Sequence, residues 1–271
     1  MLSADILHVL GQHPLGLVFD IDGTLSPIAP TPDEARLYPG TENYLRQASQ
    51  FARVGILTGR AVEDGARLVN VENLTYIGTH GLEWCEGLPA SHPVKLLPEA
   101  EPYIKPGQQL LDLAEQQLVP EIPNLIVQRK SIGGTLHYRL VPNPEQAREL
   151  ILSTLREPAH RLNMRLDEGK RAVEILAPLT INKGIALRSF VERFGLRGVI
   201  FAGDDRTDLN GILELAHLRQ DGIAAHGIVV QHPDTPPALL EHADTVVQGV
   251  AAMVELLQDI TTNLSNAKSL S

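Results

Sequence analysis

The chain is poor in cysteine, in basic charge and in long apolar runs. These shortages argue in turn against a disulfide, a nucleic-acid partner and a membrane span. Its 271 residues include one cysteine, Cys85, so no intrachain disulfide can form, which fits a reducing cytoplasm. The formal net charge is −10, whereas a nucleic-acid partner requires a basic surface. No apolar run is long enough to cross a bilayer, and residues 1–14 lack a basic segment followed by an apolar core. We therefore expect a cytoplasmic protein with no nucleic-acid partner, no membrane partner and no signal peptide; the expected oligomeric state is a monomer.

The length permits a core domain with a smaller domain attached. Short apolar stretches alternate with helical patterns in the first and last parts of the chain, which predicts an α/β core with a doubly wound, Rossmann-like parallel sheet. Between these parts, a helix followed by a β-hairpin occurs twice, which predicts an α+β unit with a small antiparallel sheet. We expect the core domain at residues 1–100 and 179–271 and the inserted domain at residues 101–178.

Within the insert, the apolar patterns predict two helices and four strands. The expected helices span 106–118 and 144–156, and the expected strands span 124–131, 135–141, 162–166 and 171–177. The second hairpin is expected to turn at residues 167–170. At the end of the chain, we expect a helix at 249–260, followed by a polar, frayed tail.

The most informative stretch of the core runs from residue 15 to residue 25. An apolar run that reads as a buried strand ends in Asp20 and Asp22, and Gly23-Thr24 follows as a turn signal. Ligands of open α/β sheets bind at the carboxyl ends of the strands. Two carboxylates this close repel each other, so one is protonated or a cation lies between them. The Asp-Gly-Thr segment alone favours an ordinary polar turn, and the function is indicated only by the full apolar strand followed by Asp-x-Asp-Gly-Thr-Leu.

Two later strands end in similar polar residues. Thr58-Gly59 follows the strand at 53–57, and Asp204, Asp205 and Asp208 follow the strand at 198–202. Parallel strands bring these ends to one edge of the sheet, and clustered carboxylates suit a hard cation such as Mg²⁺. Lys183, at the start of the preceding helix, adds a positive charge, so the set predicts a phosphoryl-binding site. Taken alone, Thr58 would read as a helix N-cap and Lys183 as a surface lysine.

This series of motifs, in order and in strand context, resembles that of the haloacid dehalogenase-like (HAD) phosphohydrolases. The resemblance implies that Asp20 is the nucleophile that forms an aspartyl-phosphate. It implies that Asp22 protonates the leaving oxygen and then activates water. Thr58 and Lys183 would bind the phosphoryl oxygens. The position of the insert, between Thr58 and Lys183, is that of the C2-type cap of this superfamily.

The same resemblance implies a Mg²⁺ site. Asp20, the backbone carbonyl of Asp22, and Asp204 would hold the ion. Asp205 and Asp208 would support it directly or through water.

Strand alternation in the insert predicts one apolar face and one polar face. If the helices of the insert cover the apolar face, the other face carries Gln128, Lys130, His137, Arg139, Asn163, Arg165 and Glu174. A solvated sheet face would show the same pattern. Taken together, these donors and acceptors suggest a polyhydroxylated substrate.

A closer resemblance, to trehalose-6-phosphate phosphatases, rests on five segments. They are Gly78-Thr79-His80-Gly81-Leu82-Glu83, Lys130 with His137-Tyr138-Arg139, Gly169-Lys170 with Val173-Glu174, Asn182-Lys183-Gly184, and Gly203-Asp204-Asp205-Arg206-Thr207-Asp208. The resemblance implies that the substrate is bound by Gly59, Arg60, His80, Glu83, Lys130, His137, Arg139 and Glu174.

The chain departs from that family at three places. Leu176 stands where the family has a basic residue, and either Arg165 or Lys170 could supply the missing group. Thr58 replaces a common serine, and Leu209-Asn210 follows Asp208 where the family often has Glu-Asp. The departure at Leu176 bears on the identity of the sugar and leaves the chemistry at Asp20 untouched.

The sequence thus predicts a Mg²⁺-dependent sugar-phosphate phosphatase, with trehalose 6-phosphate as its substrate. Alternatives with the same chemistry are a phosphatase for sucrose phosphate or a glycosyl-glycerate phosphate, or a phosphomutase. An alternative of another class is a non-catalytic sugar-phosphate sensor on the same fold. The pair Asp20 and Asp22 favours the enzyme, because a binding protein needs no second carboxylate beside the first.

Overall fold

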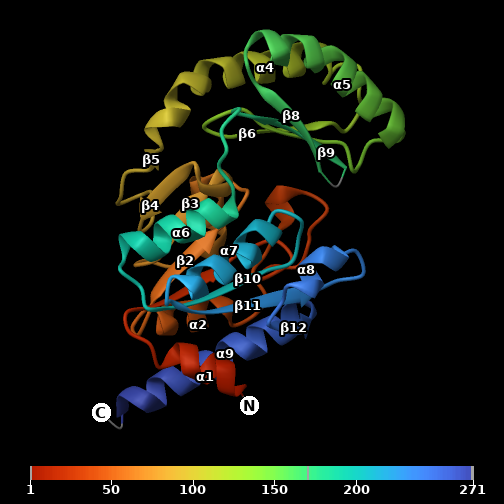
Figure 1. Ribbon diagram of the computed structural model, residues 1–271. Helices are drawn as coiled ribbons and strands as arrows, with labels where there is room; N and C mark the ends of the chain where they lie inside the picture. The colour runs from red at the N-terminus through yellow and green to blue at the C-terminus, as the bar shows by residue number, and fades with distance from the viewer. Residues whose placement is uncertain (1, 170, 270–271) are drawn as a thin grey trace. The chain divides into compact units, whose positions relative to one another are not determined.

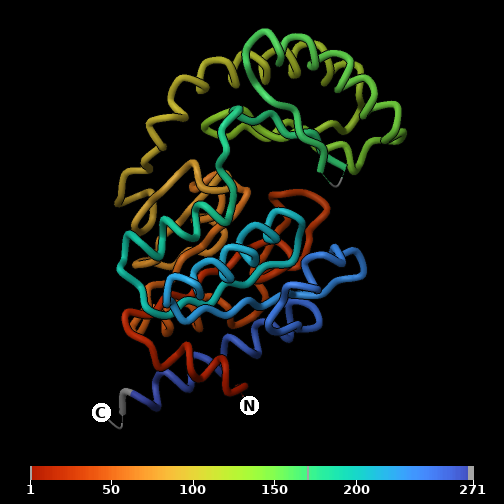
Figure 2. Tube along the Cα trace, in the orientation of Figure 1, coloured from red at the N-terminus to blue at the C-terminus, as the bar shows by residue number. Residues whose placement is uncertain are grey.

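A computed structural model describes residues 2–169 and 171–269 (Figure 1). The chain divides into two compact units, the first formed by Met1–Lys95 with Ile181–Ser271 and the second by Leu96–Thr180. In the first unit, the two ends of the chain interleave: β1, in red, pairs with β2, in orange, and with β10, in blue-green (Figure 2).

The first unit contains an eight-stranded sheet in the order β12-β11-β10-β1-β2-β3-β4-β5. Every pairing from β12 to β3 is parallel, and β4 pairs antiparallel with β3. The strands are β1 (Leu15–Phe19), β2 (Arg53–Leu57), β3 (Thr75–Gly78), β4 (Glu83–Glu86), β5 (Lys95–Leu96), β10 (Gly198–Gly203), β11 (Ala224–Gln231) and β12 (Thr245–Gln248). The predicted α/β class with a mostly parallel sheet is therefore confirmed.

Helices cover both faces of this sheet. Leu17 and Phe19 of β1 belong to the core on one face and Val18 to the core on the other, as alternation along a strand requires. The helices are α1 (Ala4–Leu10), α2 (Thr41–Ala48), α3 (Val62–Val69), α6 (Lys183–Arg193), α7 (Leu209–Gln220), α8 (Pro237–Glu241) and α9 (Gly249–Ser269), with 3-10 turns η1 (Pro32–Glu34) and η2 (Thr79–Gly81). Because helices cover both faces of the sheet, its strands are buried on both sides, and their sequences are continuous apolar runs.

The second unit is built on a four-stranded antiparallel sheet in the order β6-β7-β9-β8. The strands are β6 (Ile126–Arg129), β7 (Gly134–His137), β8 (Arg165–Gly169) and β9 (Ala172–Leu176); the helices are η3 (Pro98–Tyr103), α4 (Ile104–Gln117) and α5 (Pro144–Arg161). Leu136 pairs with Val173, and both are fully buried on the face that α4 and α5 cover. Thr135 pairs with Glu174 on the opposite face. The prediction of one apolar and one polar face is confirmed.

Two details of the insert differ from the prediction. Asn163 lies in a turn after α5 with φ of 52°, so it is not part of a strand, and β8 begins only at Arg165. Residues 167–169 therefore belong to β8 and do not form the predicted turn, while Lys170 lies outside the described residues. Likewise β7 ends at His137, and Arg139 lies in the turn that follows.

The end of the chain also differs from the prediction. α9 continues to Ser269, because Leu257, Ile260 and Leu264 fall on one helix face and are buried. The Thr261 hydroxyl, also buried, donates to the Leu257 carbonyl oxygen at 2.7 Å. Among the described residues, no helix is both long and apolar enough to cross a membrane.

Candidate active site

Three neighbouring strands of the first unit end in polar residues at the same edge of the sheet. Phe19 pairs with Ile56 of β2 and with Ala202 of β10, so Asp20, Thr58 and Asp204 follow adjacent strand ends. The backbone N–H of Asp20 still donates to the Ala202 carbonyl oxygen, at 2.9 Å. This bond fixes the backbone position of Asp20 just beyond the end of β1. Asp20, Thr58 and Asp204 thus lie at one edge of the sheet, as the parallel pairing of their strands predicts.

Lys183 lies between two buried carboxylates. Its Nζ is 2.8 Å from Asp20 Oδ1 and 2.7 Å from Asp208 Oδ1, and all three side chains are almost fully buried. The site forms because Asn182 caps α6, accepting from the backbone N–H groups of Gly184 and Ile185, and so begins the helix at Lys183.

Burial sets the protonation of this cluster. It raises the pKa of Asp20 to about 7, although Lys183 opposes the shift. It raises the pKa of Asp208 in the same way. Burial alone would lower the pKa of Lys183, but the adjacent Asp20 and Asp208 outweigh it and raise that pKa well above its ordinary value. The lysine therefore stays charged, and the raised pKa values of Asp20 and Asp208 show that ionising both acids is unfavourable without further positive charge.

The arrangement fits a hard divalent cation. Asp20, Asp204 and Asp208 each offer a carboxylate oxygen, and these oxygens lie within 4.8 Å of one another. All three side chains are buried, and oxygen donors of this kind suit Mg²⁺. This buried triad could hold a metal ion.

Asp208 and Asp205 also shape the loop. Asp208 Oδ2 accepts from the backbone N–H groups of Asp204 and Asp205, at 3.0 and 3.1 Å. Asp205 Oδ1 accepts from the backbone N–H and the hydroxyl of Thr207, at 2.8 and 2.7 Å. Burial would raise the pKa of Asp205, but Lys183 and these hydrogen bonds lower it to about 2. Asp205 is therefore ionised, and it does not belong to the three-residue cluster.

The turn after Asp20 requires a glycine. Gly23 has φ of +89°, and a Cβ there would lie 2.2 Å from Asp204 Oδ2. Two contacts of this turn were not predicted from the sequence: the Thr24 hydroxyl donates to Asp204 Oδ1 at 3.4 Å, and His232 Nε2 lies 2.7 Å from the Gly23 carbonyl oxygen. Thr24 could have been suspected from its place in the motif, whereas His232 is 209 residues away and carries no signal.

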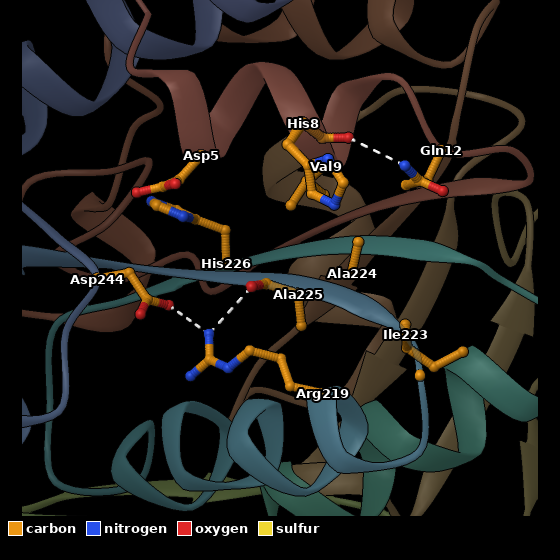
Figure 3. Close-up of a pocket in the computed structure, with 11 residues that line it drawn as sticks. Asp5, His8, Val9, Gln12, Arg219, Ile223, Ala224, Ala225, His226 and Asp244 are labelled. Carbon is orange, nitrogen blue, oxygen red and sulfur yellow. Dashed lines mark hydrogen bonds and ion pairs between the residues drawn. The ribbon is translucent and has the colours of Figure 1, made fainter.

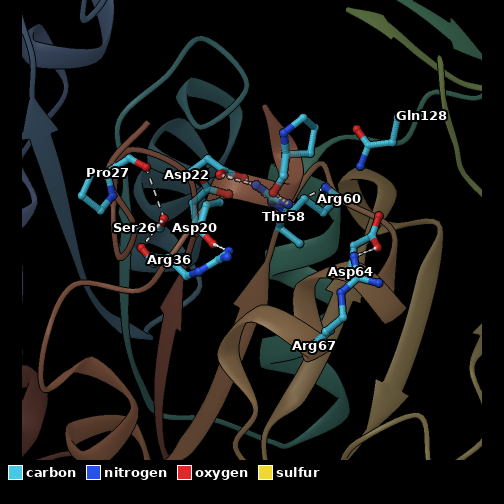
Figure 4. A network of polar contacts seen from close by, with 12 residues as sticks. Asp20, Asp22, Ser26, Pro27, Arg36, Thr58, Arg60, Asp64, Arg67 and Gln128 are labelled. Atoms are coloured by element: carbon cyan, nitrogen blue, oxygen red, sulfur yellow. Dashed lines mark hydrogen bonds and ion pairs between the residues drawn. The ribbon is translucent and has the colours of Figure 1, made fainter. Parts of the chain in front are cut away.

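Asp22 is held by Arg60 in a two-point ion pair (Figure 4). Arg60 Nε is 2.6 Å from Asp22 Oδ2, and Nη2 is 2.7 Å from Oδ1. The Asp22 side chain thus points to Arg60 and is not in the cluster of Asp20, Asp204 and Asp208. Thr58 is buried, and its hydroxyl oxygen accepts from the Arg60 backbone N–H at 3.2 Å.

Glu83 and His80 lie beside the same strand end. Glu83 is fully buried and accepts from the Val62 backbone N–H and the Thr79 hydroxyl, both at 2.8 Å. His80 has φ of 57°, and its ring is so close to Gly59 that a Cβ there would lie 2.7 Å from His80 Cε1. Glu83 therefore ties the start of α3 to η2, and substrate contacts by these residues stay predictions.

The polar face of the insert carries four of the predicted residues in two contacts. Lys130 Nζ is 3.0 Å from Glu174 Oε1, and His137 Nε2 is 2.9 Å from Gln128 Oε1. Thr135, which was not predicted, donates its hydroxyl to Glu174 Oε1 at 3.3 Å.

The other predicted residues of the insert are placed differently. Arg165 pairs with Leu176 across the β8–β9 ladder, so the two side chains share a face. Arg139 is exposed in its turn.

A cavity of about 530 Å³ lies elsewhere in the first unit, at the amino end of β11, and was not predicted (Figure 3). The Asp5 and His8 side chains of α1 line it from one side, and His226 points toward α1 from the strand. Arg219 lines it as well and bonds to Asp244 at 2.8 Å and to the Ala225 carbonyl oxygen at 3.0 Å. Because Asp20 lies at the carboxyl ends of the strands, this cavity is separate from the acidic cluster.

An open parallel sheet with buried aspartates at the carboxyl ends of its central strands, together with an antiparallel insert, defines a protein of the haloacid dehalogenase-like fold. A solved structure of a trehalose-6-phosphate phosphatase related protein superposes with a TM-score of 0.77 at 23% identity, covering 93% of this chain and 99% of that one. The C-terminal domain of Candida albicans trehalose-6-phosphate phosphatase gives a TM-score of 0.77 at 18% identity, covering 95% of each chain. These likenesses show the fold.

The sequence shows the family. The pattern of the family described as trehalose-phosphatase matches residues 18–236, and the chain belongs to this family. The trehalose-phosphate phosphatase of Mycobacterium leprae is 30% identical over 225 residues, which are 80% of this chain and 50% of that protein. The chain thus spans about half the length of the curated relatives of that name.

Proposed function

We propose that the protein is a Mg²⁺-dependent phosphatase that hydrolyses trehalose 6-phosphate to trehalose and phosphate. The observation that carries the proposal is Lys183 bridging the buried carboxylates of Asp20 and Asp208, in a chain of the trehalose-phosphatase family. The name of the 30% identical relative supports the choice of substrate. A cluster of buried acids around one lysine has little use in a protein that only binds a sugar.

In the proposed first step, an oxygen of the Asp20 carboxylate attacks the phosphorus, and the bond from phosphorus to the sugar oxygen breaks. The Asp22 carboxyl group gives its proton to that oxygen, which leaves as the sugar hydroxyl. Lys183 and Thr58 bind phosphoryl oxygens and stabilise the charge that they carry. The 2.8 Å contact between Lys183 and Asp20 keeps nucleophile and cation adjacent from the start.

In the proposed second step, water attacks the phosphorus of the aspartyl-phosphate. Asp22, now a carboxylate, takes one proton from the water, and the bond between phosphorus and the Asp20 oxygen breaks. Phosphate leaves, the Asp20 carboxylate is restored, and Asp22 carries a proton again, this one taken from the water. The net reaction of the two steps converts a phosphate ester and water into an alcohol and phosphate.

A bound Mg²⁺ would supply positive charge beside the phosphoryl group. Asp20, Asp204 and the backbone carbonyl of Asp22 would hold it. Asp205 and Asp208 would support it directly or through water, and their carboxylates also fix the loop that carries them.

The polar face of the insert is the proposed site for the sugar. Lys130, His137 and Glu174 would bind hydroxyl groups, and Arg139 would add a positive charge. Arg165 would supply the basic group that the family has at position 176, and its pairing with Leu176 on the same face of the sheet supports this. Gly59, His80 and Glu83 would complete the pocket for the phosphate beside Thr58.

The test is phosphate release with Mg²⁺ from a panel of trehalose 6-phosphate, sucrose 6-phosphate, a glycosyl-glycerate phosphate and glucose 6-phosphate. We expect fastest turnover of trehalose 6-phosphate, and none with Asp20→Asn. Asp33→Asn is the matched control, because the Asp33 side chain is 94% exposed and does not belong to the three-residue cluster. If no substrate of the panel releases phosphate, the proposal that the protein is a phosphatase is wrong. If only the other sugar phosphates release it, the proposal that trehalose 6-phosphate is the substrate is wrong.

A further inference from the structure

Arg60 is held in place by more than Asp22. Its Nη1 donates to the Pro32 carbonyl oxygen at 3.2 Å, and its own carbonyl oxygen accepts from the Thr79 backbone N–H at 2.8 Å. The guanidinium group thus connects the loop after β1 to the end of β2. The Arg60 side chain is 11% exposed, compared with 37% for Asp22, so the arginine is the more buried partner of the pair.

We propose that Arg60 is a positioning residue for Asp22 and does not bind the phosphoryl group. This inference rests on the proposed function, in which Asp22 is the acid and base. The Nε and Nη2 donors, which form one edge of the guanidinium group that can grip two oxygens, are both directed at the Asp22 carboxylate at 2.6 and 2.7 Å, and Nη1 on the other edge donates to the Pro32 carbonyl oxygen. A phosphate that bound Arg60 in the same way would have to displace that carboxylate.

The two-point contact suits the task of Asp22. A single contact would let the carboxylate rotate, whereas two parallel N–H···O bonds fix its plane and its direction. Each oxygen accepts one bond from Arg60 and keeps a further lone pair for the proton that moves between the sugar oxygen, Asp22 and water. Arg60 can therefore hold Asp22 through both steps without being released.

The test compares Arg60→Gln and Arg60→Lys with the unmodified protein. Arg67→Gln is the matched control, since Arg67 lies on the adjacent helix α3, is 69% exposed and also pairs with an aspartate, Asp64, at 2.7 Å. For each protein, kcat and KM are measured on the best sugar phosphate of the panel and on p-nitrophenyl phosphate, and the Kd of inorganic phosphate is measured by calorimetry.

If Arg60 positions Asp22, Arg60→Gln lowers kcat on the sugar phosphate by about 10- to 100-fold, the scale of losing the alignment of a reacting group. KM and the phosphate Kd stay unchanged, because no phosphate contact is lost. The loss is smaller in kcat/KM for p-nitrophenyl phosphate, which reports formation of the aspartyl-phosphate from a leaving group that needs little protonation. Arg60→Lys recovers only part of kcat, since an ammonium group lacks the two-point geometry.

A double-variant cycle separates this role from a general effect on folding. In an Asp22→Asn background, Arg60→Gln should cost little further activity, because the group that it positions is already disabled. A rise in KM and in the phosphate Kd with kcat retained would overturn the proposal and make Arg60 a phosphate-binding residue. An unchanged kcat in Arg60→Gln, with the unmodified protein active, would overturn the role alone. Absence of turnover by the unmodified protein would instead overturn the proposed function, and this role with it.

Discussion

His232 donates a hydrogen bond from Nε2 to the carbonyl oxygen of Gly23, at 2.7 Å. Because a carbonyl oxygen can only accept, the ring carries its proton on Nε2. The bond joins the loop after β11 to the turn after β1. That turn carries Asp22 on one side and Thr24, which bonds to Asp204, on the other. A residue far along the chain thus fixes the backbone next to the Asp22 carbonyl, which is a proposed metal-binding group.

We predict that His232→Leu weakens Mg²⁺ binding. Loss of one hydrogen bond of about 1 kcal/mol corresponds to an increase of roughly fivefold in the Kd for Mg²⁺, measured by calorimetry. His232→Gln can still present an N–H group and should recover most of the affinity. His217→Leu serves as the control, because the His217 side chain is 63% exposed and pairs only with Glu214 among the contacts described. Equal Kd values for His232→Leu and the unmodified protein would show that the Gly23 turn holds its shape unaided.

Lys183→Met should strongly destabilise the protein in the absence of Mg²⁺. The variant leaves Asp20 and Asp208 buried without their cation, a loss of about 3–5 kcal/mol in the free energy of unfolding. Saturating Mg²⁺ should reduce the loss, since it replaces part of the missing positive charge. Urea unfolding with and without Mg²⁺ measures both effects. Lys105→Met, at an exposed position of α4, is the control, and a similar small loss in both variants would contradict the prediction.

The strand ends were predictable from sequence because each depends on local information. Asp20, Thr58 and Asp204 each follow a short apolar run that forms a strand. Parallel pairing brings the carboxyl ends of these strands together, and this does not depend on the paths of the connecting loops. The partners of Asp22 and Gly23 were not predictable, because Arg60 and His232 reach them from loops whose paths depend on the whole fold. A local error, the predicted strand through Asn163, arose because an apolar–polar alternation continues across a turn in the left-handed region.

The pH dependence of stability should include a contribution from His226. Burial lowers the pKa of His226 in the folded protein below its ordinary 6.5, so the unfolded chain binds a proton more readily. The contribution of a neutral, buried His226 is therefore complete above pH 6.5 and is lost as the pH falls toward the folded pKa.

The measurement is urea unfolding at pH 7.5, 6.5 and 5.5, pH values chosen to span roughly the titration of an imidazole. His226→Gln should flatten the fall in stability between the first and last of these. Asp20, whose pKa is raised to about 7, acts in the opposite direction, because a carboxyl that protonates more readily in the folded state gains stability as the pH falls. That contribution is the same in both proteins and cancels in the comparison. His217→Gln is the control, and equal slopes for His226→Gln and the unmodified protein would refute the prediction.

Glu174 offers a test of how the insert contributes to specificity. Its Oε1 accepts from Lys130, whose side chain is only 4% exposed, and from Thr135, so Glu174→Gln removes the negative charge that orients a nearly buried ammonium group. If this face binds the sugar, kcat/KM for the sugar phosphate should fall by roughly tenfold or more, the scale of one charge-assisted hydrogen bond. The value for p-nitrophenyl phosphate, which has no sugar, should not change. Glu168→Gln is the matched control, because Glu168 lies on the opposite face of the same sheet, where it pairs with Arg148. Equal losses on both substrates would mean that Glu174 supports the insert as a whole and has no part in choosing the sugar.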